Sequence, residues 1–442
     1  MNNKKLFAVN LNEFNLEFLK QGAKKYNCKY IQKFLKLKKV ETYSKDTKQD
    51  KDLDPWVQSI SMNTGKRSDN HQIYNLGEKI PKKTIQIWDK LSKQKKSCAI
   101  WGTMNTTFKD NKYLKIFLPD PWNNQSKVKP KELENFYLLP REYAQNYTSF
   151  NLSSNISKVL LLIFYLIRKL TFSNLINLLP TCVNMIFKKG IQNYMLFFLF
   201  DIVSLKVFEK LSKNYKLNFS LIFLNSLAHY QHNNWNEKSS HKYYFYFTNK
   251  ILKIIFDIAN NYDSLIIYNG FSQKKINAQY MIRPKNLKLF LKNIGIDFES
   301  LHSNMTNGAI VSFMDKNNFK RAINILKKYN ICGYVVFEFK KVNEKQIFIR
   351  VKIRSKNDLS SYKKTLNNFK NNFFYEEKNK TLNKNVNNKI DIFIKSMVFI
   401  KTTSKHTSNG VLFYKDTRIE EKKIENIKIF NLISKFFTKN EK

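Results

Sequence analysis

Two histidines follow a buried strand in a chain that contains few histidines. Residues 219–224 form an apolar run of strand length, and Asn225, His229 and His232 come directly after it. Only 6 of the 442 residues are histidines, so two of them three positions apart at a strand end predict metal binding or acid/base chemistry. Capping or buried, hydrogen-bonded imidazoles are the structural alternative.

An acidic residue follows the first apolar segment of the chain. Residues 6–9 form a short predicted strand, and Asn12 and Glu13 lie beyond it. Polar groups just past a strand end are placed to contact a ligand, although the same position suits the N-cap of the helix expected up to about residue 34. We interpret Asn12 mainly as a cap and Glu13 mainly as a functional residue.

A second acidic residue stands at a predicted helix start. Asp54 precedes Pro55, which the first turn of a helix tolerates, and Gly65 is placed to end that helix. A helix N-terminus offers free backbone N–H groups to an anion. Asp54 or Glu13 is therefore the candidate catalytic acid/base or alternative nucleophile beside a bound anion.

The third chemical signal is a histidine near the C-terminus. His406 lies in the polar segment 402–410, which we interpret as a loop that Gly410 closes before a strand. We expect His229 and His406 to converge and to share a metal ion through their ring nitrogens, with His232 ranked second to His229. The other residues expected at this site are Asn225, Glu13 and Asp54.

The formal net charge of +44 would normally indicate a nucleic acid or an anionic membrane as partner. The lysines are spread over the whole chain and interleaved with Asn, Ile and Phe, as a compositionally biased genome would produce. We therefore do not expect nucleic-acid binding. The charge does favour attraction of a small anionic substrate.

Three further features of the sequence bear on the class of protein: the cysteines, the N-terminus and the apolar runs. The four cysteines form no CxxC pair, which argues against a zinc ribbon or a disulfide framework. The first apolar run is too short for a signal peptide, so we expect a cytoplasmic protein. The apolar runs at 159–167 and 194–200 are shorter than the roughly twenty residues that span a bilayer. We interpret them as helices of an insertion, with contact to a membrane surface as the alternative.

Short apolar strands alternate with helical patterns in both halves of the chain. This alternation predicts an α/β fold with a doubly wound, mostly parallel sheet that carries its site at the strand ends preceding Glu13, Asn225 and Gly270. The predicted segments are the first part of the α/β domain (1–124), a helical insertion (125–216), the second part (217–282), an α+β insertion (283–390) and the C-terminal part (391–442).

One set of motifs resembles a known family. Thr64 and Gly65, followed by His71 after a Pro/aromatic helix start, are similar to the "TG…P…HG" region of type I phosphodiesterases and nucleotide pyrophosphatases in the alkaline phosphatase superfamily. The strand ending in Pro119-Asp-Pro-Trp122 agrees with this resemblance. The similarity covers roughly residues 1–125, 217–285 and 395–416.

The resemblance implies two metal ions around a phosphoryl group. Asn225, His229 and His406 match the Asp-x-x-x-His pair and the distant His of one metal site, with an amide in place of the carboxylate. The second site is eroded, because Asn269 and Gly270 stand where an Asp-His pair is expected and no Thr or Ser occupies the nucleophile position near Asp54. Asn10, Asn12 or Glu13 would stand at the position of its first ligand.

Three functions remain from the sequence. The first is a divergent hydrolase of phosphate or sulfate esters that uses zinc or manganese, as a single ion. The second is a catalytically degenerate member of the fold that has lost its metal and binds an anionic ligand or partner. The third is a polyanion-binding protein without catalysis. The oligomeric state is left open.

Overall fold

The chain folds into two compact units, each with its own core. Unit 1 consists of Met1–Arg141, Leu152–Ile276 and Ser404–Lys442, and unit 2 consists of Glu142–Asn151 and Asn277–Thr403. All the residues singled out for chemistry belong to unit 1. The computed structural model describes residues 4–46, 53–78, 80–81, 83–123, 127–170, 180, 183–184, 186–187, 192–303, 308–331, 334–335, 337–351, 354–355, 397–417 and 419–438.

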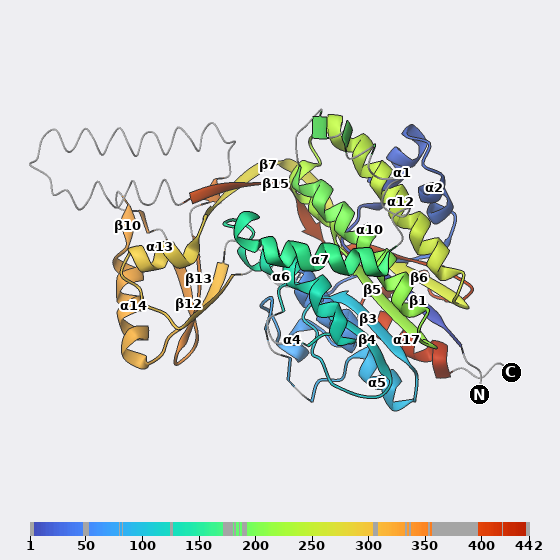
Figure 1. Cartoon of the computed structure of the whole chain (residues 1–442), viewed down its shortest axis with the longest axis horizontal. Coiled ribbons are helices and arrows are strands. Elements are labelled where there is room, and N and C mark those ends of the chain that lie inside the picture. The colour runs from blue at the N-terminus through green and yellow to red at the C-terminus, as the bar shows by residue number, and fades with distance from the viewer. Residues whose placement is uncertain are drawn as a thin grey trace, which may run out of the picture. The chain divides into compact units, whose positions relative to one another are not determined.

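A mostly parallel sheet forms the centre of unit 1 (Figure 1). Its strands are β1 (Leu6–Leu11), β2 (Lys38–Tyr43), β3 (Cys98–Thr103), β4 (Leu114–Pro119), β5 (Phe219–Leu224), β6 (Ser264–Tyr268), β16 (Asn409–Lys415) and β17 (Lys423–Glu425). The order is β17-β2-β16-β6-β1-β5-β3-β4. The segment from β6 to β4 is parallel throughout, whereas β16 runs antiparallel to both β6 and β2. The predicted mostly parallel sheet is confirmed.

Helices cover both faces of this sheet, as predicted. Successive side chains of β1 point to opposite faces of the sheet. Phe7 and Val9 accordingly belong to the hydrophobic cluster on one face, and Leu6 and Ala8 belong to the cluster on the other. The helices are α1 (Leu16–Lys25), α2 (Lys29–Leu35), α3 (Pro55–Thr64), α4 (Ser68–His71), α5 (Ile87–Lys93), α6 (Glu134–Asn146), α7 (Ile156–Lys169), α10 (Asn193–Ser212), α11 (Ser226–Asn234), α12 (His241–Ala259) and α17 (Lys428–Thr438), with the short 3-10 turns η2 (Lys131–Leu133), η3 (Ser153–Asn155) and η4 (Lys238–Ser240).

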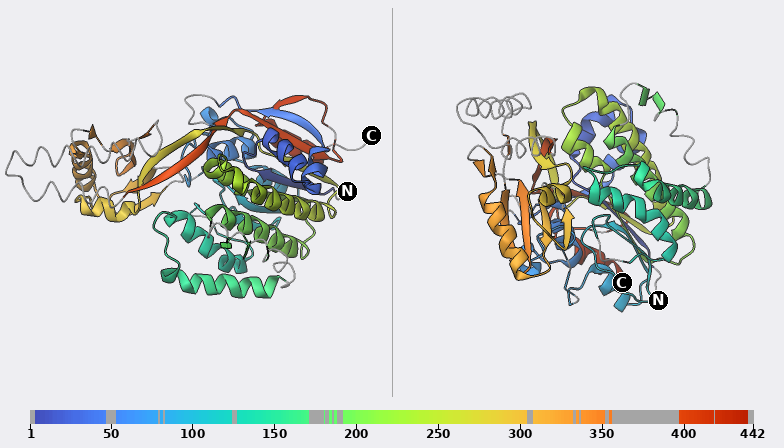
Figure 2. Two further views of the ribbon diagram at one scale, coloured as in Figure 1. Left: turned by 90° about the horizontal axis from the view of Figure 1, so that it is seen from above. Right: turned by 60° about the vertical axis from the view of Figure 1, so that its left-hand side comes forward.

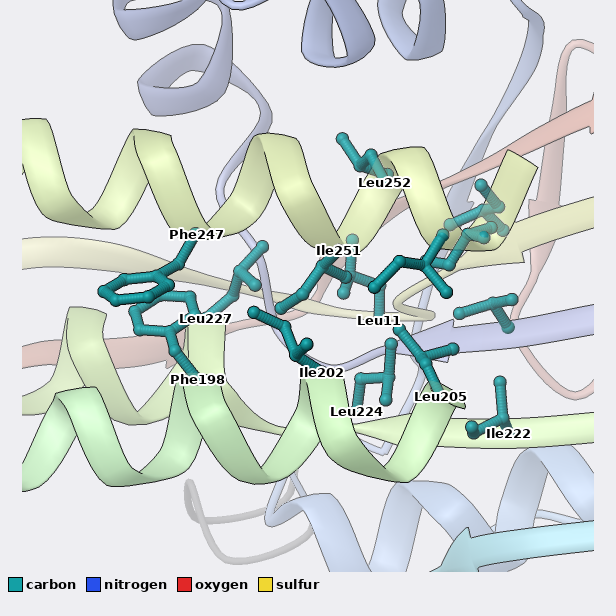
Figure 3. Packing of buried hydrophobic residues seen from close by; sticks show 14 of the residues in the cluster. Leu11, Phe198, Ile202, Leu205, Ile222, Leu224, Leu227, Phe247, Ile251 and Leu252 are labelled. Atoms are coloured by element: carbon teal, nitrogen blue, oxygen red, sulfur yellow. The ribbon is translucent and has the colours of Figure 1, made fainter. Parts of the chain in front are cut away.

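The apolar run at 194–200 belongs to the core of unit 1. It lies in α10, which packs beside α12 over β1 and β5 (Figure 3). The rings of Phe198 and Phe247 stack between these two helices with centroids 5.3 Å apart. The sequence correctly predicts a helix here, but α10 covers the sheet itself, because its buried side chains fill the space between β5 and α12.

Local signals determine where several helices begin and end. Pro55 occupies the first turn of α3, and Gly65 ends it with a φ of 68°, as predicted. The single helix expected up to residue 34 is instead two helices, α1 and α2, because Asn27 adopts a left-handed φ of 46° between them. The strand β2, which follows α2, has no counterpart among the sequence predictions.

Unit 2 is a small α+β structure, as predicted for that part of the chain. Its antiparallel sheet has the order β12-β13-β9-β8. The elements of this unit are α13 (Leu287–Asn293), β8 (Ser300–Ser303), β9 (Gly308–Ser312), α14 (Lys316–Lys328), β10 (Asn330–Ile331), β11 (Tyr334–Val335), β12 (Phe337–Asn343), β13 (Gln346–Val351) and β14 (Arg354–Ser355). The strands β7 (Ser272–Pro284) and β15 (Met397–Thr407) each run from one unit into the other. The segment 367–389, which is rich in Asn and Lys and for that composition is predicted from sequence to be a loop, lies outside the described residues.

Candidate functional site

The candidate site begins where the two central strands end side by side. Leu11, the last residue of β1, is in parallel register with Leu224, the last residue of β5. Because parallel strands end at the same edge, the residues that follow them are neighbours. Asn12 donates from Nδ2 to Oδ1 of Asn225 at 2.7 Å across this edge.

Glu13 is the centre of the site. Its carboxylate Oε2 lies 3.1 Å from Nε2 of His232 and 3.0 Å from Nε2 of His406. One ligand atom from each of these three residues lies within 4.8 Å of the others, and the described ranges contain no second group of this kind. Glu13 is 1% exposed, whereas the side chains of His232 and His406 are 31% and 19% exposed. The group is therefore accessible from the side of the imidazoles.

The backbone at Glu13 is held in an unusual conformation. Its φ is 53°, in the left-handed region that costs a residue other than glycine roughly 1–3 kcal/mol. Gln231 of α11 donates from Nε2 to the backbone carbonyl of Glu13 at 3.1 Å and so supports it. The strained turn directs the carboxylate toward the two imidazoles.

Amide donors fix both oxygens of the Glu13 carboxylate. Asn12 Nδ2 donates to Oε1 at 2.9 Å, and Gln273 Nε2 donates to Oε2 at 2.5 Å. Burial opposes ionisation, but the charges of His406 and His232 and their hydrogen bonds outweigh it and hold the pKa of Glu13 well below its usual value. The site therefore contains a buried carboxylate in its charged form.

A chain of hydrogen bonds determines the tautomer of His232. The carbonyl Oε1 of Gln273 can only accept, so the single hydroxyl proton of Ser404 is donated to it at 2.7 Å. Ser404 Oγ then accepts from Nδ1 of His232 at 3.0 Å. In a neutral His232 the proton is thus on Nδ1, and the lone pair of Nε2 points at the Glu13 carboxylate. A cation or a further proton must lie between these two atoms.

His406 lies between two carboxylates. Its Nε2 faces Glu13, and its Nδ1 lies 3.9 Å from Oδ1 of Asp54. Asp54 is the residue before α3 and makes no side-chain hydrogen bond to the first turn of that helix. His406 itself lies on strand β15, which corrects the prediction of a loop at 402–410. Strand periodicity places Ser404 and His406 on one face, and this spacing is a sequence signal that could have identified Ser404.

His229, which the sequence ranked ahead of His232, lies outside the group. Its ring stacks on Phe197 with centroids 3.6 Å apart, and its Nε2 is buried without a hydrogen-bond partner among the described residues. Burial, and then the nearby charge of His232, lower the pKa of His229 to about 3. It is therefore a neutral, packed imidazole one turn of α11 before His232.

Asn269, and His71 of the motif that resembles the phosphodiesterases, make hydrogen bonds that hold the fold together and do not reach the Glu13 group. Asn269 donates from Nδ2 to the carbonyl of Phe14 and accepts at Oδ1 from the backbone of Val411, so it joins neighbouring segments and not the Glu13 group. His71 accepts at Nδ1 from the Ile73 N–H, so its Nε2 donates to Oγ of Ser61. Because that imidazole is a donor to Ser61, it cannot serve as its general base.

Besides Ser404, the sequence prediction missed Gln273 at this candidate site. It lies on β7 and contacts Glu13, Ser404 and the backbone of Ala228. A lone Gln after a glycine turn carries no recognisable spacing, so only the tertiary structure identifies it.

Comparisons with known proteins give distant similarity in structure alone. No family model matches the chain, and no curated protein sequence matches it. Murine ectonucleotide pyrophosphatase/phosphodiesterase 5 superposes with a TM-score of 0.44 at 8% identity, covering 99% of this chain and 96% of that chain. The human counterpart gives 0.40 at 9% identity, with the same coverage. Phosphonoacetate hydrolase from Sinorhizobium meliloti 1021 gives 0.38 at 9% identity, covering 98% of this chain and 95% of that chain. Similarity at this level carries no argument about activity.

Proposed function

We propose that Glu13, His232 and His406 bind one divalent metal ion and that the protein is a metal-dependent phosphoester hydrolase. The observation that carries the proposal is the convergence of two imidazole nitrogens and a buried carboxylate oxygen on one point. The tautomer of His232 supports it, because a lone pair facing a carboxylate requires a cation or a proton between them.

The ligand set fits zinc. Two His and one Glu form a known catalytic zinc set with an open fourth position. Ligand atoms about 2.0–2.1 Å from a tetrahedral zinc ion are separated from each other by roughly 3.3 Å. The distances of 3.0 and 3.1 Å from Glu13 Oε2 to the two Nε2 atoms are close to that separation. Manganese is the second choice, because it prefers more oxygen ligands than this group offers.

The charge of the site favours an anionic substrate. A divalent ion with Glu13 as its one ligating carboxylate keeps a formal charge of +1, which the nearby, partly exposed Asp54 reduces. The whole chain adds an attractive field for anions through its formal charge of +44. A bound zinc ion would polarise a phosphoryl oxygen and lower the pKa of a water molecule. The resemblance of the sequence to type I phosphodiesterases agrees with a phosphate ester as substrate, with a sulfate ester as the alternative.

The residues around the ligands have separable roles in this proposal. Ser404 and Gln273 hold His232 with Nε2 directed at the metal position. Asp54 lies beside Nδ1 of His406 and would orient that ring, as a carboxylate behind a ligating histidine commonly does. We therefore assign Glu13 as a ligand and Asp54 as a positioning residue, in place of the acid/base roles expected from sequence.

The experiment measures metal content and hydrolysis on the full chain. Zinc and manganese are quantified by mass spectrometry, and activity is measured with bis(p-nitrophenyl) phosphate, p-nitrophenyl phosphate and p-nitrophenyl sulfate. We expect one zinc per chain and its loss in His232→Asn and His406→Asn. The control His302→Asn removes an imidazole from unit 2 and should retain the metal and the activity.

Two outcomes would contradict the proposal in different ways. Loss of metal in His229→Phe with retention in His232→Asn would restore the ligand order expected from sequence. Stoichiometric metal without hydrolysis of any of the three esters would favour the degenerate, ligand-binding alternative.

A further inference from the structure

The outer face of helix α7 is apolar and exposed. Its residues Ile156, Leu160, Ile163, Phe164 and Ile167 are between 47% and 63% exposed. At 100° per residue they fall within one arc of roughly 100° on the helix surface. Soluble proteins rarely expose a contiguous apolar patch without a partner for it.

The opposite face of α7 is already packed. Tyr165 is 4% exposed and lies against Phe136 with ring centroids 6.0 Å apart, while Leu162 and Leu166 contact the core of unit 1. In Figure 2, α7 lies on the outside of the helical layer of unit 1, beyond α10. The exposed stripe is therefore not the face by which the helix attaches to its own domain.

The charge of the surrounding chain identifies the partner. Residues 152–200 contain no Asp or Glu, although the whole chain of 442 residues contains 34 of these acidic residues. The same segment contains the basic residues Lys158, Arg168, Lys169, Lys188 and Lys189. The exposed guanidinium of Arg168 lies 5.7 Å from the ring of Phe164, at the margin of the stripe. One acid lies beside α7, because the carboxylate of Glu132 pairs with Lys169 at 2.8 Å. Lys158 and Arg168 leave the margin of the apolar stripe with a net positive charge, which matches an anionic lipid surface.

The length of α7 excludes a membrane-spanning role. Fourteen residues rise about 21 Å as an α-helix, which is less than the roughly 30 Å of a bilayer core. None of the other described helices is long and apolar enough to cross a bilayer either. A helix of this kind lies in the plane of the interface with its apolar side chains among the acyl chains.

We propose that the exposed face of α7 docks unit 1 on an anionic lipid bilayer. A second copy of the chain is a poorer partner, because two surfaces of net positive charge would repel each other when they meet. A lipid surface supplies the negative charge that a second copy lacks. This inference does not depend on the metal site.

The test is flotation of the full chain with vesicles of phosphatidylcholine alone and of phosphatidylcholine with 30% phosphatidylglycerol, in 0.1 M and 0.5 M salt. High salt screens the attraction that a net charge of +44 produces without insertion. The test variant is Leu160→Ser, Phe164→Ser and Ile167→Ser together. The control is Ile85→Ser, Met314→Ser and Val342→Ser, which changes three apolar residues that are also exposed but lie elsewhere.

We expect wild type and control to float with the anionic vesicles at both salt concentrations. The α7 variant should lose at least tenfold in apparent affinity at 0.5 M salt, with unchanged circular dichroism and melting temperature. Equal binding of the two triple variants would mean that the net positive charge of the chain, and not the apolar face of α7, attracts the vesicles. That result would overturn the proposal. A dimer by light scattering that the α7 variant converts to a monomer would show that a second copy covers this face.

Discussion

Replacing Glu13 with glutamine tests the central carboxylate without changing its size. In the wild type both oxygens accept from amide donors, Oε1 from Asn12 and Oε2 from Gln273. Glutamine has one oxygen, so in either orientation its NH2 group faces another NH2 group. A buried donor without a partner costs about 1–3 kcal/mol.

The same change removes the charge that faces His232 and His406. Truncating one partner of a fully buried ion pair costs about 3–5 kcal/mol. The two imidazoles are 31% and 19% exposed, so water reduces this contribution. Together the two effects predict a loss of about 2–4 kcal/mol from the unfolding free energy of the metal-free protein at pH 7.

The pH dependence follows from the lowered pKa of Glu13. A carboxyl whose folded pKa lies below its unfolded value, about 4.3, stabilises the fold above that unfolded value. This contribution is lost as the pH falls through the folded pKa. The difference between wild type and Glu13→Gln should therefore decrease below about pH 4.3.

The assay is urea unfolding in EDTA followed by tryptophan fluorescence. All five tryptophans lie in unit 1, so the signal reports that unit alone. Glu17→Gln is the matched control, because Glu17 is 69% exposed, pairs with Lys20 and should cost less than about 0.5 kcal/mol. Added zinc at 100 times its Kd should stabilise wild type by about 2.7 kcal/mol and the Glu13 variant by much less. Equal unfolding free energies for the two variants in EDTA would refute the hydrogen-bond argument.

Three further predictions concern other parts of unit 1. Ser404→Ala removes the acceptor for His232 Nδ1 and should weaken zinc binding about 10–100-fold by calorimetry, with Ser404→Thr as the conservative control; unchanged affinity would contradict the tautomer assignment. Burial lowers the pKa of His71 from 6.5 to about 4, so the unfolded chain binds more protons between these values and stability should fall by up to about 3 kcal/mol from pH 6.5 to 4. His71→Gln should flatten that dependence in urea titrations, and an equally steep profile would refute it. Gly22→Ala should destabilise unit 1 by about 1–3 kcal/mol in urea, because the added methyl group would overlap the buried ring of Phe245; a gain in stability would mean that the ring moves aside.

Local patterns in the sequence determined most secondary structure and the general position of the site. Pro55 and Gly65 delimit α3 because each has an intrinsic backbone preference that acts within a few residues. The alternation of apolar strands with helices predicted the parallel sheet, since parallel strands need long crossovers. Placing functional groups at the ends of β1 and β5 follows from that topology, which is why Glu13 could be selected from sequence.

The tertiary structure decided which residues meet at that edge. His229 and His232 belong to one short helix, and only the packing of α11 determines which imidazole turns toward Glu13. In the fold the ring of His229 stacks on Phe197 of α10, and His232 consequently faces the carboxylate. Gln273 and His406 reach the same point from β7 and β15, more than 250 residues along the chain from Glu13. Periodicity describes one element at a time, so contacts between distant elements depend on packing that no local pattern contains.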